Sequence, residues 1–279
     1  MSLIENVSDT ARWVCVYRAR ENDRPNGLFR DPYAGRLAGA RGAEIAARMK
    51  SQDRNEWAYV IRTYLFDSFI QEQIDGGVDM VINLAAGLDA RPYRMNVPPS
   101  LQWIEVDLPE ITEYKEEVLE GETPRCSLER EKLDLADAGA RRQLFDRLAA
   151  KSKKALIVSE GLLIYLGAEN VRSLADDLAA RPSFKRWVFD IGSPGLLKMM
   201  MKQVGKELNA ASAPLKFAPA EGPEFFAASG WRVAECRSTF KTAGEKKRLP
   251  FILSLFAKLP EPKKPGNRPW SATCLVTRE

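Results

Sequence analysis

The stretch VINLAAGLDARPYRM, residues 81–95, joins an apolar run to a turn of small residues and then to a segment rich in arginine. A short apolar run that ends at glycine is typical of a strand buried on both faces. Ala85, Ala86 and Gly87 would let a ligand approach the backbone closely, and Gly87 can adopt dihedral angles closed to other residues. A glycine after a strand is most often only a turn, so the meaning of this stretch depends on what surrounds it.

Similar apolar runs recur along the chain, separated by helical or polar segments. They are DMVINLAA (79–86), LQWIEVDL (101–108), ALIVSEGLLIYL (155–166) and RWVFDIG (186–192). Between the last two, residues 167–180 place Val171, Leu174, Ala175 and Leu178 on one helical stripe. Strands that alternate with helices predict an α/β fold with a mostly parallel sheet covered on both faces.

The segments on either side predict further helices. Residues 1–75 read as an N-terminal helical cap, in which Ile61, Leu65 and Phe69 recur at four-residue spacing. Residues 76–279 then form the core, interrupted by a helical insertion at about 193–216 that is placed to cover a ligand site. We expect the sheet to close with a strand pair formed by 231–240 and 271–278.

The composition excludes several classes of site. The chain has no histidine, which rules out a Ser-His-Asp triad, a Cys-His pair and a histidine-ligated metal. The four cysteines, Cys15, Cys126, Cys236 and Cys274, form no Cys-x-x-Cys pair, so their spacing indicates neither zinc nor a disulfide framework. We therefore expect no metal site and reduced, mostly buried thiols.

Charge and hydropathy predict a cytoplasmic protein that binds neither nucleic acid nor membrane. The formal net charge is only +4, and the basic clusters EKKR (245–248) and EPKKPGNR (261–268) lie in segments typical of solvated loops. The N-terminal residues carry charges every few positions, unlike a signal peptide or an anchor. The longest later apolar run, FILSLFA (251–257), is too short to span a bilayer.

Acidic side chains end two of the predicted strands. Asp107 lies 20 residues after Gly87, close to the separation expected for an acid that binds ribose hydroxyls. Glu105 alternates with it, so a buried strand would expose both carboxylates on one side; alternatively, one of them caps the helix that follows. Glu160 interrupts a very apolar run and should meet a cation, either Arg62, Arg91 or the ammonium of a bound amino acid.

A third acid is harder to interpret. Asp134 follows a strand-like piece, but an Asp before a helix is usually an N-cap, and its neighbour Leu135 is equally suited to the core. Tyr93 and Tyr165 lie near the predicted site in sequence, where an aromatic residue either orients a ligand or packs.

Four segments together carry a resemblance: RTYLFDSFI (62–70), NLAAGLDARPYRM (83–95), EVDLPEITEYKEEVL (105–119) and SEGLLIYL (159–166). In order and spacing they resemble the S-adenosylmethionine-dependent methyltransferases of the leucine carboxyl methyltransferase-like family, which includes bacterial polyketide-type O-methyltransferases. The resemblance implies a Rossmann-like class I methyltransferase fold with a seven-stranded sheet, and S-adenosyl-L-methionine as the cofactor.

The same resemblance implies roles for individual residues. Arg62 would face the methionine carboxylate and Glu160 the ammonium side, while Gly87, with Ala85 beside it, would contact the methionine and ribose. Asp107 would bind the ribose hydroxyls, and Asp134 and Leu135 the adenine. Leucine-methylating members also use an N-terminal lysine near the cofactor, whereas the segment TARWVCVYRARE (10–21) offers only arginines.

We therefore expect an O-methyltransferase that acts on a carboxylate or hydroxyl of a small-molecule acceptor, with no catalytic base assigned. An acceptor carboxylate is already ionised and suits a chain without histidine. The alternatives are a non-catalytic scaffold that binds partners through the methionine-rich helix LLKMMMKQV (196–204), and methylation of a protein C-terminus. An NAD-dependent oxidoreductase ranks lower, since the chain has no G-x-G-x-x-G and no Tyr-x-x-x-Lys. The acceptor and the oligomeric state stay open.

Overall fold

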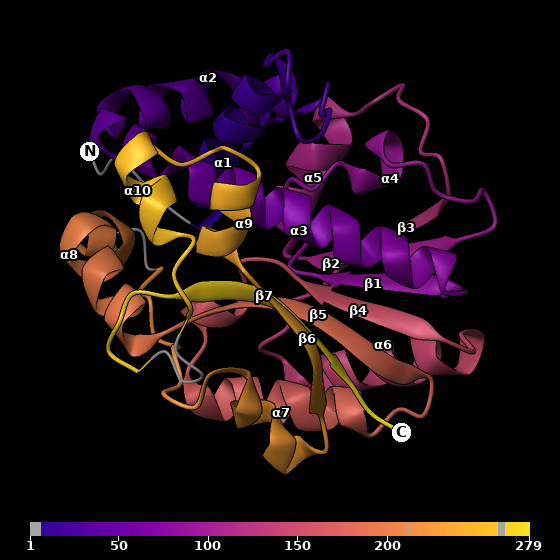
Figure 1. Cartoon of the computed structure of the whole chain (residues 1–279). Coiled ribbons are helices and arrows are strands. Elements are labelled where there is room, and N and C mark those ends of the chain that lie inside the picture. Colours follow the sequence, from indigo (N-terminus) through magenta and orange to yellow (C-terminus); the bar gives the residue numbers. More distant parts are fainter. Residues whose placement is uncertain (1–6, 211–212, 262–265) are drawn as a thin grey trace.

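The computed structural model describes residues 7–210, 213–261 and 266–279, and these build one seven-stranded sheet between layers of helices (Figure 1). The strands are β1 (Met80–Leu84), β2 (Gln102–Asp107), β3 (Ser127–Lys132), β4 (Ala155–Ser159), β5 (Phe184–Gly192), β6 (Arg232–Ser238) and β7 (Ser271–Thr277). Their order is β3-β2-β1-β4-β5-β7-β6, with β7 antiparallel to both of its neighbours and the other pairs parallel. The predicted mostly parallel α/β fold is confirmed.

The helices come before, between and after the strands. They are α1 (Val7–Asn22), α2 (Ala34–Arg48), α3 (Glu56–Asp75), α4 (Arg91–Arg94), α5 (Pro109–Val118), α6 (Ala138–Lys151), α7 (Ala168–Ala179), α8 (Pro194–Ala210), α9 (Thr239–Glu245) and α10 (Phe251–Phe256). Short 3₁₀ turns are η1 (Lys50–Asn55), η2 (Leu163–Tyr165) and η3 (Gly222–Ser229). In Figure 1 the N-terminal helices lie above the sheet, and α6 and α7 lie below it.

Each face of the sheet has its own apolar core. On one face α3 buries Phe66, Phe69 and Ile70 against alternate residues of the central strands. On the other face α6, α7 and η3 pack together, and the predicted stripe of α7 is fully buried there. Every residue of β1 and of β4 is buried, which explains why these strands read as continuous apolar runs.

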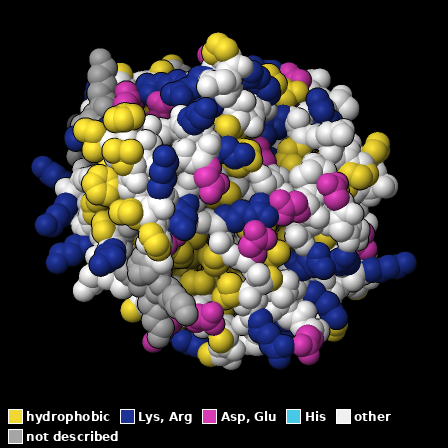
Figure 2. Space-filling model, in the orientation of Figure 1, with side chains coloured by type: hydrophobic (Ala, Val, Ile, Leu, Met, Phe, Trp, Pro, Cys, Tyr) yellow, Lys and Arg dark blue, Asp and Glu magenta, His cyan; other side chains and the backbone are white. Residues whose placement is uncertain are grey.

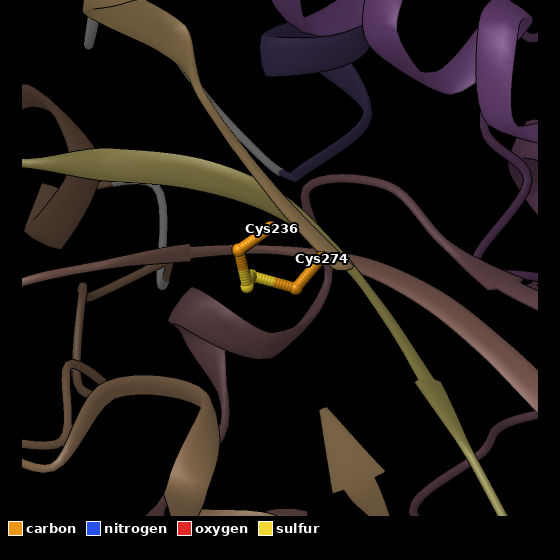
Figure 3. Close-up of a disulfide and its surroundings, with 2 residues drawn as sticks. All are labelled: Cys236 and Cys274. Carbon is orange, nitrogen blue, oxygen red and sulfur yellow. A yellow bond between two sulfur atoms is a disulfide. The ribbon is translucent and has the colours of Figure 1, made fainter. Parts of the chain in front are cut away.

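The C-terminal part agrees with the predicted elements and adds a covalent bond. β6 and β7 form the expected pair, which is antiparallel. The predicted insertion contains α8, which ends at Ala210; residues 211–212 lie outside the described ranges, and 213–216 are not helical. The register sets Cys236 opposite Cys274 with 4.2 Å between their Cα atoms, and a disulfide joins them (Figure 3). The expectation of reduced thiols is thus wrong for this pair and holds for the buried, free Cys15 and Cys126.

Two predictions concern residues outside the described ranges. The first six residues of the predicted helical cap fall there, as does part of the basic cluster at 261–268. Within the described ranges, no helix combines the length and apolarity needed to cross a bilayer.

Candidate functional site

A cavity of about 500 Å³ opens beyond the carboxyl ends of β1, β2, β4 and β5. The strand order reverses direction beside β1, which pairs with β2 on one side and β4 on the other, and ligands of open α/β sheets bind at such a point. All seven predicted site residues line this one cavity: Arg62, Ala85, Gly87, Asp107, Asp134, Leu135 and Glu160. The structure therefore brings the predicted set together, while the role of each residue stays a prediction.

The turn after β1 has an unusual backbone. Ala85 and Gly87 both have positive φ angles, 53° and 49°, a region that disfavours residues with a Cβ. A Cβ built on Gly87 would lie 3.6 Å from the Cβ of Ala11, which is an ordinary contact. The backbone conformation thus favours glycine at 87, and Gly87 lines the cavity without a side chain.

Asp107 holds this turn in place from the end of β2. Its Oδ2 accepts a hydrogen bond of 2.6 Å from the Gly87 N–H, and its Oδ1 accepts one of 2.8 Å from the Leu108 N–H. Each carboxylate oxygen has a second lone pair, and Asp107 lines the cavity. Burial raises the pKa of Asp107, and the two backbone bonds offset only part of that effect. The alternative of a helix cap is wrong, because α5 has no side-chain cap.

Glu105 does not accompany Asp107 into the cavity. Its side chain is only 3% exposed, and it accepts bonds from Lys115 Nζ at 2.7 Å and from Arg130 Nε at 2.9 Å. The expectation that both carboxylates share an exposed side is therefore wrong. β3 and α5 cover the end of β2 and supply the two cations, which the sequence alone did not place.

Glu160 meets both of the arginines proposed for it. Its Oε1 lies 3.1 Å from Arg62 Nε, and its Oε2 lies 2.8 Å from Arg91 Nη2. Arg91 also contacts Asp67 at 2.6 Å and Asp89 at 2.9 Å, so one buried guanidinium ties three carboxylates to the β1 turn. Two arginines thus pair with the Glu160 carboxylate at the cavity wall.

Asp190, near the end of β5, is a cavity residue that the sequence analysis missed. Its Oδ1 accepts a 2.6 Å bond from the Gly161 N–H, and its Oδ2 lies 3.6 Å from Arg62 Nη1. Burial raises its pKa, although the charge of Arg62 opposes the rise. The signal was present in RWVFDIG, where an acid interrupts an apolar run just as Glu160 does.

Asp134 and Leu135 line the cavity beyond the end of β3. Asp134 is exposed, and its Oδ1 accepts a bond from the Ala136 N–H at 2.9 Å. The N-cap of α6 is Asp137, which accepts from Gly139 and Ala140, so the capping alternative for Asp134 is wrong. Leu135 is partly buried against the core, which agrees with its alternative role as well.

The remaining wall of the cavity is apolar. Trp13 of α1, Ile164 of η2 and Leu215 belong to one packed cluster that also lines the cavity, together with Met200, Val204 and Leu208 from α8. Tyr59 and Tyr165 join this wall, whereas Tyr93 packs elsewhere and accepts a bond from Arg130. Burial raises the pKa of Tyr59 to about 12, so its hydroxyl stays protonated at neutral pH. We call the part lined by these α1, α8 and η2 residues and Leu215 the apolar lobe.

Two solved structures share the whole fold. One is a DUF574 family protein from Streptomyces avermitilis, with a TM-score of 0.64 and 12% identity over 97% of both chains. The other is a provisionally named methyltransferase from Thermobifida fusca, with a TM-score of 0.64 and 11% identity over 99% of this chain and 96% of that one. At such low identity these likenesses establish the α/β methyltransferase fold alone.

Sequence comparison identifies the family. A protein of Parafrankia sp., provisionally named an S-adenosyl-L-methionine-dependent methyltransferase, is 30% identical over 251 residues, which cover 84% of this chain and 79% of the relative. A protein with the same provisional name from Mycolicibacterium paratuberculosis is 33% identical over 58% of each chain. The family model described as leucine carboxyl methyltransferase matches residues 11–179. This match spans more than half of the chain, and the chain belongs to the leucine carboxyl methyltransferase family.

Proposed function

We propose that this chain, as a member of a family of S-adenosylmethionine-dependent methyltransferases, transfers a methyl group to an oxygen atom of a small apolar acceptor. The observation that carries the proposal is the composition of the cavity. One end holds every residue assigned to the cofactor, and an apolar lobe adjoins it, formed where a packed cluster of α1, α8 and η2 residues borders the cavity. The size of about 500 Å³ suits one small molecule beside another.

The residues at the end assigned to the cofactor fit S-adenosylmethionine. The left-handed turn at Ala85 and Gly87 allows close approach, and the free lone pairs of Asp107 match a ribose diol. Arg62 and Glu160 offer one cation and one anion to an amino acid headgroup. When bound, the cofactor supplies an activated methyl group on a sulfonium that leaves as a neutral thioether.

The apolar lobe favours an acceptor with a large apolar body. Trp13, Met200 and Leu215 come from three separate segments and line the same space. A polar metabolite bound there would lose its hydration without gaining hydrogen-bond partners. Holding such a body against the wall fixes its oxygen relative to the cofactor, and positioning of this kind supplies about 7–11 kcal/mol of a displacement barrier.

The charges around the cavity favour a neutral hydroxyl over a carboxylate as the acceptor. Each arginine that lines it already faces a carboxylate: Arg18 with Asp31, Arg62 with Glu160, Arg91 with Asp89, and Arg141 with Asp177. No lysine of the described residues lines the cavity. An acceptor carboxylate would therefore compete with these carboxylates for a cation, whereas a neutral hydroxyl needs none.

A hydroxyl acceptor must lose a proton, and Asp190 is suited to take it. Its raised pKa brings it closer to neutral than an ordinary Asp, which improves a carboxylate base. The acceptor O–H bond would break as its proton passes to the Asp190 carboxylate; the oxygen electron pair would form the new bond to the methyl carbon as the bond from that carbon to sulfur breaks. Arg62 then lies beside the neutral acid and keeps Glu160 paired.

The function can be tested in two steps. Titration calorimetry with S-adenosylmethionine and S-adenosylhomocysteine should show saturable binding, which Asp107→Ala and Glu160→Ala weaken, whereas NADH should not bind. Tritiated methyl groups from the cofactor should then enter the organic-solvent extract of a bacterial lysate. Label that survives mild alkali indicates a methyl ether, and label released as methanol indicates a methyl ester. Absence of both binding and transfer would support the scaffold alternative.

A further inference from the structure

The segment from Phe251 to Leu259 presents a row of apolar side chains to solvent. The exposed fractions are 80% for Phe251, 69% for Ile252, 38% for Leu253, 52% for Leu255, 57% for Phe256 and 56% for Leu259. α10 buries none of its residues, so this helix contributes nothing to the described core. The exposed apolar area is on the order of several hundred Å², as large as the largest patch of a typical monomer, and patches of that size mark interaction sites.

Basic side chains surround this row. In Figure 1 α8 and α10 occupy the same side of the molecule, and Figure 2 shows hydrophobic side chains gathered over α10 and toward α8, with basic side chains projecting at the edge over α8. Exposed lysines of these segments are Lys198, Lys202 and Lys206 on α8, and Lys247 and Lys258 on either side of α10. We call these five lysines and the six apolar residues the α8–α10 face.

We propose that the α8–α10 face docks on the surface of an anionic lipid bilayer. Apolar side chains on a basic background are the pattern of segments that lie in the membrane interface, with the apolar groups among the lipid chains and the lysines on the headgroups. Residues 251–257 are too short to span a bilayer, which is why the sequence predicts no membrane partner. Docking in the membrane interface needs no spanning segment. The structure shows that these apolar residues are exposed, which the sequence alone did not indicate.

A second copy of the chain fits this face less well. A two-fold dimer would place the same patch against itself, so the lysines of one copy would face those of the other. Like charges brought together in this way oppose association. Anionic lipid is complementary to both parts of the face, because it accepts the apolar side chains and neutralises the lysines.

The position of α8 connects this face to the cavity. Met200, Val204 and Leu208 line the cavity, and the lysines at 198, 202 and 206 are offset from them by two positions, about 200° around a helix. One face of α8 therefore forms the apolar lobe while the opposite face would meet the bilayer. An apolar acceptor dissolved in lipid would thus lie one helix diameter from the cavity. Delivery of the acceptor from the bilayer rests on the proposed function, whereas docking on the bilayer does not.

Sedimentation with lipid vesicles tests the docking. The full chain should sediment with vesicles of phosphatidylcholine containing 30% phosphatidylglycerol at least tenfold more strongly than with phosphatidylcholine alone, and 0.5 M NaCl should weaken it. Phe251→Ser combined with Phe256→Ser should reduce binding at least tenfold. Charge reversal of Lys198, Lys202 and Lys206 to Glu should reduce it by about fivefold for each lysine.

A matched control separates specific docking from net charge. Three exposed lysines, Lys151, Lys153 and Lys185, lie near the starts of β4 and β5, at the end of these strands away from the cavity. Their reversal to Glu makes the same change in charge and should leave vesicle binding within twofold. Calorimetry with S-adenosylhomocysteine should give the same affinity for all variants, which verifies their folding and keeps this test apart from that of the function. Equal sedimentation with both vesicle types, no sedimentation, or a dimer that the double Phe variant dissociates would overturn the proposal.

Discussion

Arg91→Leu should be among the most destabilising single substitutions in this protein. The Arg91 side chain is 2% exposed and lies within 2.9 Å of Asp67, Asp89 and Glu160. Leucine retains much of the volume but leaves these carboxylates without the shared cation. Asp67 keeps Arg94 and Glu160 keeps Arg62, so Asp89 is affected most. Removing one partner of a buried ion pair costs about 3–5 kcal/mol.

The pKa of Asp89 gives an independent magnitude. Burial alone would raise this pKa, but Arg91 and other nearby cations lower it from 3.8 to about 2. Such a shift corresponds to roughly 2–3 kcal/mol of stability from all these cations together, present above pH 4 and lost as the pH falls toward 2, because the Asp89 carboxylate then takes up a proton in the folded state as well. A loss of about 3 kcal/mol at pH 7 lies within reach of both routes and corresponds to a fall in Tm of about 5 °C for a chain of 279 residues.

Thermal and urea unfolding followed by circular dichroism at pH 7, 5 and 3 measures the effect. The gap between wild type and Arg91→Leu should narrow below pH 4. As a control, Arg147→Leu removes a surface pair with Glu131 whose arginine is 44% exposed, and should cost less than about 1 kcal/mol. A loss below about 1 kcal/mol for Arg91→Leu, or a gap that does not change with pH, would refute this reasoning.

Four further outcomes are expected. Gly87→Ala, at φ 49°, should cost about 1–2 kcal/mol in urea unfolding and weaken cofactor binding in calorimetry. Asp190→Asn should lower kcat. In the wild type the rate should rise with pH on the acid side of the profile, at a pH above that expected for an ordinary Asp, because burial raises the pKa of Asp190; the substitution should remove this rise. Asp134→Ala should weaken cofactor binding without changing Tm, whereas Asp137→Ala should lose about 1 kcal/mol of stability and leave binding unchanged. Cys236→Ser should cost about 2–4 kcal/mol for a loop of 38 residues, and dithiothreitol should lower the Tm of the wild type but not of this variant.

The local sequence pattern was sufficient to predict the sheet and to place Gly87, Asp107 and Glu160 at the ends of its strands. Continuous apolar runs such as β4 belong to strands buried on both faces, and the ends of parallel strands meet at one edge. Gly87, Asp107 and Glu160 each end such a run, so their convergence follows from the strand pattern alone. The four matching segments strengthened that prediction without adding geometry.

The remainder depended on contacts between distant segments. Glu105 is buried because Lys115 and Arg130 reach it from a helix and an edge strand, and no local pattern indicates such a pairing. The disulfide required the register of β6 on β7, which sets Cys236 opposite Cys274 although 38 residues separate them. The apolar lobe combines α1, η2, α8 and Leu215, four parts that only tertiary packing assembles.

The strand order also divides the sheet at β4, although both apolar cores extend across the two parts. β1, β2 and β3 form one side of the sheet and are joined to β5, β7 and β6 only through β4. The family match ends at residue 179, so the shared sequence includes β1 to β4 and ends with α7, before β5 begins. Under the proposed function, chimaeras of relatives joined just after α7 are a natural way to exchange the part of the apolar lobe that α8 supplies.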